Sequence, residues 1–120
     1  MLGCDPAGQG VFINGVISDR AYKFQAALAE AGDNLVVVDF TASWCGPCKV
    51  IGPKFVAMAA LPENRNVVFL KVDVDEAADV AAHYEVNCMP TFLFFKNGEK
   101  IDNFAGANHI LLEQKVVAMR

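Results

Sequence analysis

Two cysteines three residues apart are the groups in this chain best suited to chemistry: Cys45 and Cys48 enclose Gly46-Pro47 and follow Trp44. On the first turn of a helix, positions i and i+3 share one face, so the two sulfurs can form a disulfide. Pro47 fits that turn, where its missing N–H has no partner to lose. The positive end of the helix dipole favours the thiolate of Cys45, which is the reactive form in disulfide exchange. The motif predicts dithiol–disulfide chemistry.

The same spacing has two other uses, as half of a zinc site and as a structural disulfide. A zinc site needs two more ligands, and the candidates form no second closely spaced pair: Cys4, His83, Cys88 and His109. We therefore expect no metal site here.

Asp39 interrupts the apolar segment 35–40, shortly before the cysteine pair. Consecutive apolar residues predict a central strand that is covered on both faces. Burial there would raise the pKa of the carboxyl, so that it could exchange protons with a thiol near neutral pH. The strand pattern alone leaves open a second interpretation, an aspartate at a strand end that faces water.

Composition limits the class of protein. The 120 residues predict one domain, and 54% hydrophobic with 20% charged residues is a globular composition. The formal net charge of −4 and the pI of about 5.0 argue against a nucleic-acid partner. No leader or membrane-spanning segment is evident, so we expect a cytoplasmic protein without membrane contact. Residues 1–10 are predicted to be a flexible tail and 11–120 the folded domain.

Strand and helix patterns alternate along the domain. Strands are predicted within 11–18 and at 35–40, 67–74, 91–95 and 100–105. Helices are predicted after Asp19, from about Cys45, at 77–84 and from about Asn108, and Asn97-Gly98 predicts a hairpin turn. The order βαβαβαββα predicts an α/β fold whose mixed sheet has helices on both faces.

Three motifs, in this order, resemble segments of the thioredoxin family. The active-site segment is matched by VVVDFTASWCGPCKVIGPKF at 36–55, the proline turn by VNCMPTFLFFKNGE at 86–99, and the last loop by FAGAN at 104–108. The resemblance covers about residues 15–120. It implies the thioredoxin fold, a central mixed sheet of five strands flanked by four helices.

The resemblance also implies an activity, the reduction of protein disulfides. Cys45 would attack a disulfide and Cys48 would resolve the mixed disulfide. No cofactor would be bound, since thioredoxin reductase would restore the dithiol with electrons from NADPH. Clients would be disulfide-containing proteins such as peroxiredoxins. The alternative is a non-catalytic binding module or subunit of the same fold, whereas Gly-Pro argues against glutathione-dependent enzymes and disulfide isomerases.

Further roles follow from the resemblance. Asp39 would lie beneath the pair and accept the Cys48 proton, and the Lys71 ammonium would approach Asp39; a solvated lysine is the alternative. The Met89–Pro90 bond would be cis, and Asp75 would hold the indole N–H of Trp44. The substrate-docking rim would consist of Trp44, Gly46, Pro47, Met89, Pro90, Thr91, Gly106 and Ala107.

Cys88 resembles an additional cysteine beside the proline turn of many animal-type members of the family. It is expected to be regulatory, through modification or through a disulfide that converts the monomer to a dimer. A thiol without a regulatory role is the open alternative.

Overall fold

The computed structural model describes residues 16–17 and 21–120. The predicted tail 1–10 and most of the predicted first strand lie outside these residues. The elements, in chain order, are β1 (Val16–Ile17), α1 (Ala21–Ala31), β2 (Val36–Thr41), α2 (Gly46–Ala59), the 3₁₀ helix η1 (Pro62–Asn64), β3 (Val68–Asp73), α3 (Ala78–His83), β4 (Thr91–Lys96), β5 (Glu99–Ala105) and α4 (His109–Met119).

One mixed sheet forms the centre of the molecule, with the strand order β1-β3-β2-β4-β5. β3 is parallel to both β1 and β2, whereas β4 is antiparallel to β2 and β5. β1 has only two residues, so the sheet consists of four longer strands and a short edge strand. The α/β class and the mixed sheet are as the order of elements predicted.

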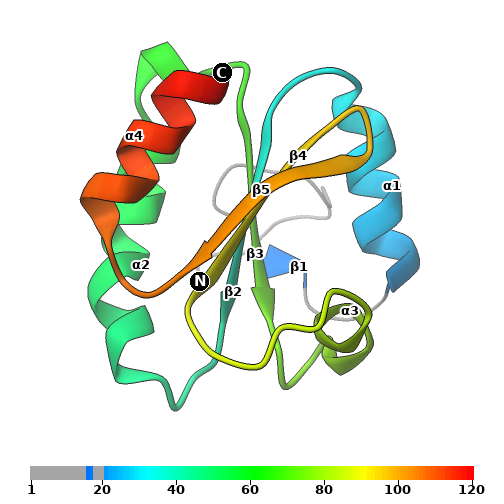
Figure 1. The fold of residues 1–120 in the computed structure, drawn as a ribbon, viewed down its shortest axis with the longest axis vertical. Coiled ribbons are helices and arrows are strands. Elements are labelled where there is room, and N and C mark those ends of the chain that lie inside the picture. The colour runs from blue at the N-terminus through cyan, green and yellow to red at the C-terminus, as the bar shows by residue number, and fades with distance from the viewer. Residues whose placement is uncertain (1–15, 18–20) are drawn as a thin grey trace.

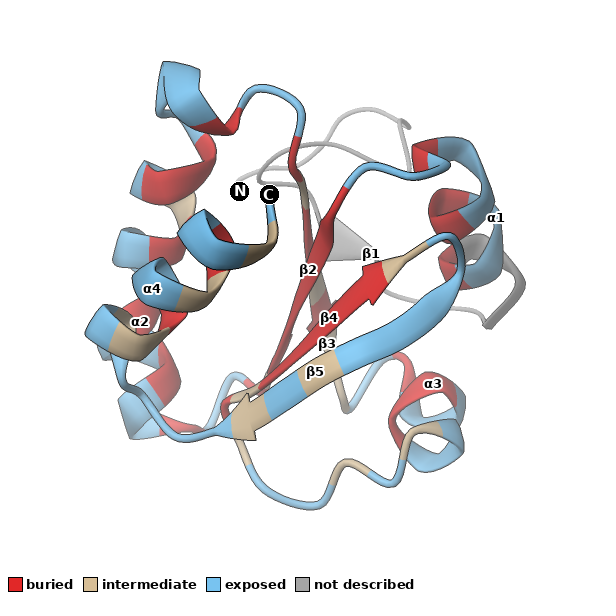
Figure 2. Ribbon diagram, turned by 45° about the horizontal axis from the view of Figure 1, so that its top comes forward, coloured by how far each residue is buried: buried red, intermediate tan, exposed pale blue. Residues whose placement is uncertain are grey.

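Helices cover both faces of the sheet: α2 and α4 pack on one face and α1 and α3 on the other (Figure 1). The buried side of each helix faces the strands, while β5 is largely exposed at its edge (Figure 2). Within the described residues, no helix has the length and apolar character that a bilayer crossing requires.

Side chains of β2 alternate between two separate cores. Val36, Val38 and Phe40 belong to the core beneath α1 and α3. Val37 belongs to the core beneath α2 and α4. Because strand side chains alternate with a period of two, Asp39 points to the same face as Val37. The strand therefore directs its single carboxyl toward the helix that begins after Cys45.

The β4–β5 hairpin turns at Asn97 and Gly98, which have φ angles of 55° and 79°. Positive φ at both central residues suits the right-handed twist of the flanking strands and favours asparagine and glycine. The turn is therefore where the sequence predicted it. It returns β5 along β4, so that Ala105 lies opposite Thr91 at the end of the sheet that follows the proline turn.

A buried asparagine joins the end of α2 to the C-terminus. Asn64 is 2% exposed. Its amide Nδ2 donates to the carbonyl of Met58 at 2.9 Å, and its Oδ1 accepts from Arg120 Nη1 at 2.6 Å. Both polar atoms of this side chain thus have partners, as a buried amide requires.

We predict that Asn64→Ala lowers the free energy of unfolding by about 1–3 kcal/mol, because it removes two hydrogen bonds and leaves the Met58 carbonyl with the Leu61 N–H, at 3.2 Å, as its donor. Arg120→Ala removes only one of these two bonds, and because Arg120 is exposed, water can replace it as the donor to Asn64 Oδ1; this variant should therefore cost less than Asn64→Ala. Urea denaturation followed by circular dichroism measures both changes. Equal losses in the two variants would contradict a contribution from the bond between Asn64 and the Met58 carbonyl.

Candidate functional site

Cys45 and Cys48 form a disulfide at the start of α2, with their Cα atoms 5.3 Å apart. Cys45 is the N-cap of the helix, and its Sγ accepts the backbone N–H of Cys48 at 3.1 Å. Pro47 lies in the first turn, as the motif predicted. A negative charge on the Cys45 sulfur would therefore face a backbone donor and the positive end of the helix dipole.

Exposure does not distinguish the two sulfurs in this disulfide-bonded state. Cys45 is 4% exposed and Cys48 6%. They pack with Ala42 in a small cluster that Val74 and Met89 also contact. The helix-capping contact of Cys45, and not its exposure, is therefore what sets the two sulfurs apart.

Asp39 is buried, 1% exposed, on the face of the sheet that α2 covers. Its direct neighbours are Lys71 on β3 and Phe92 on β4. Its Oδ1 has no hydrogen-bond partner. Burial raises the pKa of Asp39 from 3.8 to about 7, and the positive charge of Lys71 acts in the opposite direction. The carboxyl can thus gain or lose a proton near neutral pH, and the water-facing alternative is excluded.

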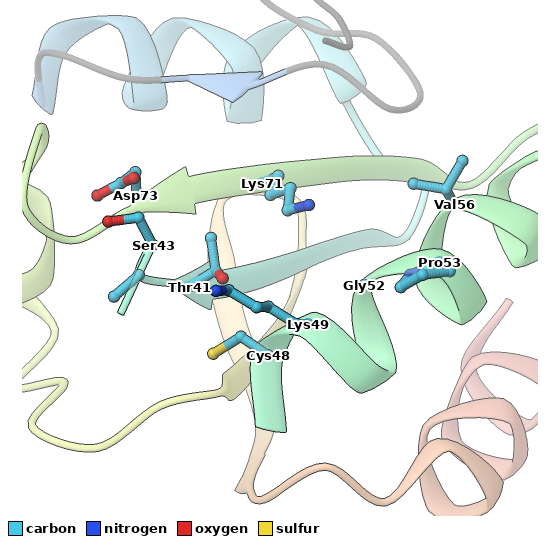
Figure 3. A pocket seen from close by; sticks show the side chains of 10 residues that line it. Thr41, Ser43, Cys48, Lys49, Gly52, Pro53, Val56, Lys71 and Asp73 are labelled. Atoms are coloured by element: carbon cyan, nitrogen blue, oxygen red, sulfur yellow. The ribbon is translucent and has the colours of Figure 1, made fainter. Parts of the chain in front are cut away.

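Lys71 affects Asp39 through its field and forms no ion pair with it within 4.0 Å among the described residues. In Figure 3 the Lys71 side chain extends from β3 toward Gly52 on α2. A Cβ placed on Gly52 would lie 3.6 Å from Lys71 Nζ. The lysine is therefore neither fully solvated nor directly paired, a position between the two alternatives considered from the sequence.

An open pocket of about 690 Å³ adjoins Cys48 between α2 and the sheet. Cys48 lines it together with the polar side chains of Thr41, Ser43, Lys49, Lys71 and Asp73 (Figure 3). The other lining residues are Ala42, which precedes α2, and Gly52, Pro53 and Val56 of α2. The pocket has room for water beside the second cysteine and the lysine that faces Asp39.

The proline turn lies against the cysteine pair. The Met89–Pro90 bond is cis, as the family resemblance predicted. Met89 packs on the cluster that holds both cysteines. The carbonyl of Pro90 accepts the backbone N–H of Gly106 at 2.9 Å, which joins the turn to the loop after β5. Met89 thus lies against the cysteine pair, and the bond to Gly106 connects this turn to a segment that is far away in sequence.

Trp44 is 64% exposed beside the cysteine pair. Its indole Nε1 donates to Asp75 Oδ2 at 2.9 Å, so the predicted pairing is present. Asp75 is itself positioned by its backbone N–H, which donates to Asp73 Oδ1 at 2.8 Å. An exposed aromatic ring with a fixed orientation beside a reactive group is suited to contact a partner.

Comparisons with known proteins agree with this geometry. The family model described as Thioredoxin matches residues 15–118. The thioredoxin of Ictalurus punctatus is 62% identical over 93 residues, which cover 78% of this chain and 87% of the relative. The chain belongs to the thioredoxin family.

Further members support the assignment to this family. The thioredoxin of Ovis aries is 57% identical over 98 residues, with 82% of this chain and 91% of the relative covered. The crystal structure of Fasciola hepatica thioredoxin matches with a TM-score of 0.83 and 42% identity, over 88% of this chain and 98% of that chain. As a thioredoxin-family protein with a cysteine pair at disulfide distance, this chain is a thiol–disulfide oxidoreductase.

Thioredoxins carry no bound cofactor, and the residues described contain no cluster of three or more His, Cys, Asp or Glu side chains suited to a metal ion. The comparisons give no support to a non-catalytic binding module.

Cys88 is an exposed free cysteine just before the proline turn. Its carbonyl accepts a hydrogen bond from Thr91 Oγ1 at 2.5 Å, and its Sγ lies 3.9 Å from the same hydroxyl. Cys88 lies beside the proline turn, as the family resemblance implied, whereas its regulatory role stays a prediction.

Sequence reasoning did not find two of the residues near Cys48, Gly52 and Asp73. Both had a signal. Gly52 is four residues after Cys48 and so shares its helix face, and Asp73 is two residues after Lys71 and so shares its strand face. The Thr91–Cys88 hydrogen bond had no such signal, because it depends on the path of the turn.

We predict that Asp39→Asn stabilises the disulfide form by about 1–4 kcal/mol at pH 8, because the substitution removes a buried charge. The folded pKa of about 7 exceeds the ordinary value of 3.8. The folded state therefore binds more protons between these values, and the wild type loses stability as the pH rises through them. Well below pH 3.8 the carboxyl is protonated in both the folded and the unfolded state, so the advantage of the variant should disappear.

Urea denaturation at several pH values measures this difference. Asp102→Asn is a matched control in which the change in stability should have the opposite sign, because the hydrogen bond from Lys115 lowers the pKa of Asp102. That variant should be slightly less stable than the wild type at neutral pH, with the difference lost as the pH falls. An Asp39→Asn protein less stable than the wild type at pH 8 would contradict the account.

Proposed function

We propose that this protein reduces disulfides of client proteins, with Cys45 as the attacking nucleophile and Cys48 as the resolving thiol. The observation that carries the assignment of roles is that Cys45 Sγ caps α2 and accepts the Cys48 N–H. This contact favours negative charge on Cys45, and the thiolate is the reactive species. The buried Asp39 supplies a group that can take a proton near neutral pH.

The proposed reaction has two exchanges. The Cys45 thiolate attacks one sulfur of the client disulfide, forms a mixed disulfide and releases the other client sulfur as a thiolate. Cys48 then passes its proton toward Asp39 through water and attacks Cys45 Sγ. This second step breaks the mixed disulfide, releases the second client thiolate and leaves the Cys45–Cys48 disulfide.

Regeneration of the Cys45 thiolate and the Cys48 thiol needs two electrons and one proton. We propose that thioredoxin reductase, which uses NADPH, donates these electrons. We also propose that the protein works in the cytoplasm. Clients are proteins with accessible disulfides, peroxiredoxins among them. The family relationship supports these partners as a class.

Lys71 is proposed to tune this step. Its charge lowers the pKa of Asp39 against the effect of burial. Without this charge the carboxyl would stay protonated to higher pH and accept a proton less readily at neutral pH.

Client chains are proposed to dock along the rim around the pair. The proposed rim consists of Trp44, Gly46 and Pro47, which adjoin the cysteines in sequence, and of the proline turn with Gly106 and Ala107, of which Met89 packs on the pair and Gly106 bonds to Pro90. The backbone of Met89 has no hydrogen-bond partner among the described residues. An extended client segment could pair with it in the manner of an added strand.

We predict that Cys45→Ser abolishes insulin reduction in an assay with NADPH and thioredoxin reductase, because a serine hydroxyl cannot replace the thiolate. Cys48→Ser should also lose turnover but accumulate covalent adducts with the client, since attack continues and resolution does not. Non-reducing electrophoresis and mass spectrometry detect the adducts. Turnover by Cys45→Ser, or adducts in Cys45→Ser but not in Cys48→Ser, would contradict the assigned order.

We further propose that Cys88 links two copies under oxidising conditions, because it is exposed at the docking rim. Treatment of the protein with diamide should give a dimer on a non-reducing gel, and dithiothreitol should remove it. Cys88→Ser should stay monomeric. A dimer that persists in Cys88→Ser but disappears in Cys4→Ser would assign the bond to Cys4 instead.

A further inference from the structure

The proline turn is fixed at two points on either side of Met89. Before it, the carbonyl of Cys88 accepts a hydrogen bond from Thr91 Oγ1 at 2.5 Å. After it, the carbonyl of Pro90 accepts from the Gly106 backbone at 2.9 Å. Between these points Met89 packs on the cysteine pair with its own backbone unpaired among the described residues.

Thr91 is well placed to hold the turn because its own backbone is fixed. It begins β4, the strand between β2 and β5. Its partners in the sheet are Phe40 on β2 and Ala105 on β5. A residue paired on both sides moves little, so its hydroxyl ties the start of the turn to the sheet.

A threonine hydroxyl has one proton to donate. In this structure the short contact to the Cys88 carbonyl uses it, and the contact to Cys88 Sγ is much longer at 3.9 Å. Direct donation from Thr91 to a client would require this bond to break. The hydroxyl is therefore better suited to shape the docking surface than to contact the client.

We propose that Thr91 is a positioning residue, whose hydroxyl holds the Cys88 carbonyl and thereby aligns the Met89 backbone for an extended protein client. The inference rests on the proposed function and replaces the direct substrate contact expected for Thr91 from the family resemblance. Strand-like pairing needs donor and acceptor within narrow limits of distance and angle. A small displacement of the turn would weaken such pairing without altering the chemistry of the sulfurs.

If this is so, loss of the Thr91 hydroxyl should affect reduction of a protein disulfide and of a small aromatic disulfide differently. A protein disulfide presents an extended backbone to Met89, whereas 5,5′-dithiobis(2-nitrobenzoate) has no peptide groups. Loss of the Thr91 hydroxyl should therefore impair reduction of the protein and spare reduction of the aromatic disulfide. A merely structural defect would impair both.

The test compares Thr91→Val, which keeps the branched shape without the hydroxyl, with Thr91→Ser, which keeps the hydroxyl. Thr91→Val should raise the KM for insulin about three- to tenfold, the loss expected for one hydrogen bond. Its rate with 5,5′-dithiobis(2-nitrobenzoate) should change less than about twofold. Thr91→Ser should keep the KM for insulin within about twofold of the wild type. Circular dichroism checks that each variant folds, and Thr91→Ala provides the same comparison if Thr91→Val does not.

Unchanged insulin kinetics in the folded variants lacking the hydroxyl would overturn the inference, as would equal losses with both disulfides. Failure of Thr91→Ser to restore the KM would also overturn it. A wild-type protein that reduces neither disulfide would instead overturn the proposed function, and this inference with it.

Discussion

The proposed disulfide chemistry depends on a carboxyl that the fold shields from bulk solvent. Asp39 lies on a central strand between Lys71 and Phe92, with the apolar side of α2 above it. Burial outweighs the field of Lys71 and raises the pKa to about 7. A shift of about three units corresponds to roughly 4 kcal/mol between the two protonation states. The two cores that flank the sheet must supply enough stability to tolerate this group, and seven fully buried phenylalanines contribute to them: Phe24, Phe40, Phe55, Phe69, Phe92, Phe94 and Phe95.

Acidity of the attacking sulfur explains only part of the reactivity. For thioredoxins in general, a thiol pKa of about 7 in place of the ordinary value of about 8.5 raises the thiolate fraction at neutral pH roughly fifteenfold. The less basic sulfur is also less nucleophilic, by about fivefold for a Brønsted slope of about 0.4 to 0.5. The net gain in the rate of disulfide exchange is therefore only a few-fold. Proximity of the second thiol contributes more, because a well-oriented intramolecular group reacts as if at very high concentration. The helix that places Cys48 one turn from Cys45, and the carboxyl that can take its proton, are therefore central to the proposed mechanism.

Much of the fold was predictable because its signals are local. Period-two and helical patterns located the strands and helices, and Asn97-Gly98 located the hairpin. The strand pattern alone left open whether Asp39 is buried, and the family resemblance favoured burial. The cis bond at Pro90 came from the family resemblance, since sequence alone favours trans. Other features depend on how distant segments meet. The placement of Lys71 near Asp39 without a direct ion pair, the contacts of Asn64 and the bond between Thr91 and Cys88 follow from packing that no local pattern encodes.

The proposed role of Asp39 requires that its carboxyl titrates near neutral pH. Carbon-13 NMR of the disulfide form, with labelled aspartate and with Asp39→Asn to assign the resonance, measures this directly. We expect the Asp39 carboxyl carbon to titrate with a midpoint of about 7. A midpoint near the ordinary value of 3.8 would show that the carboxyl is solvated and would contradict the account.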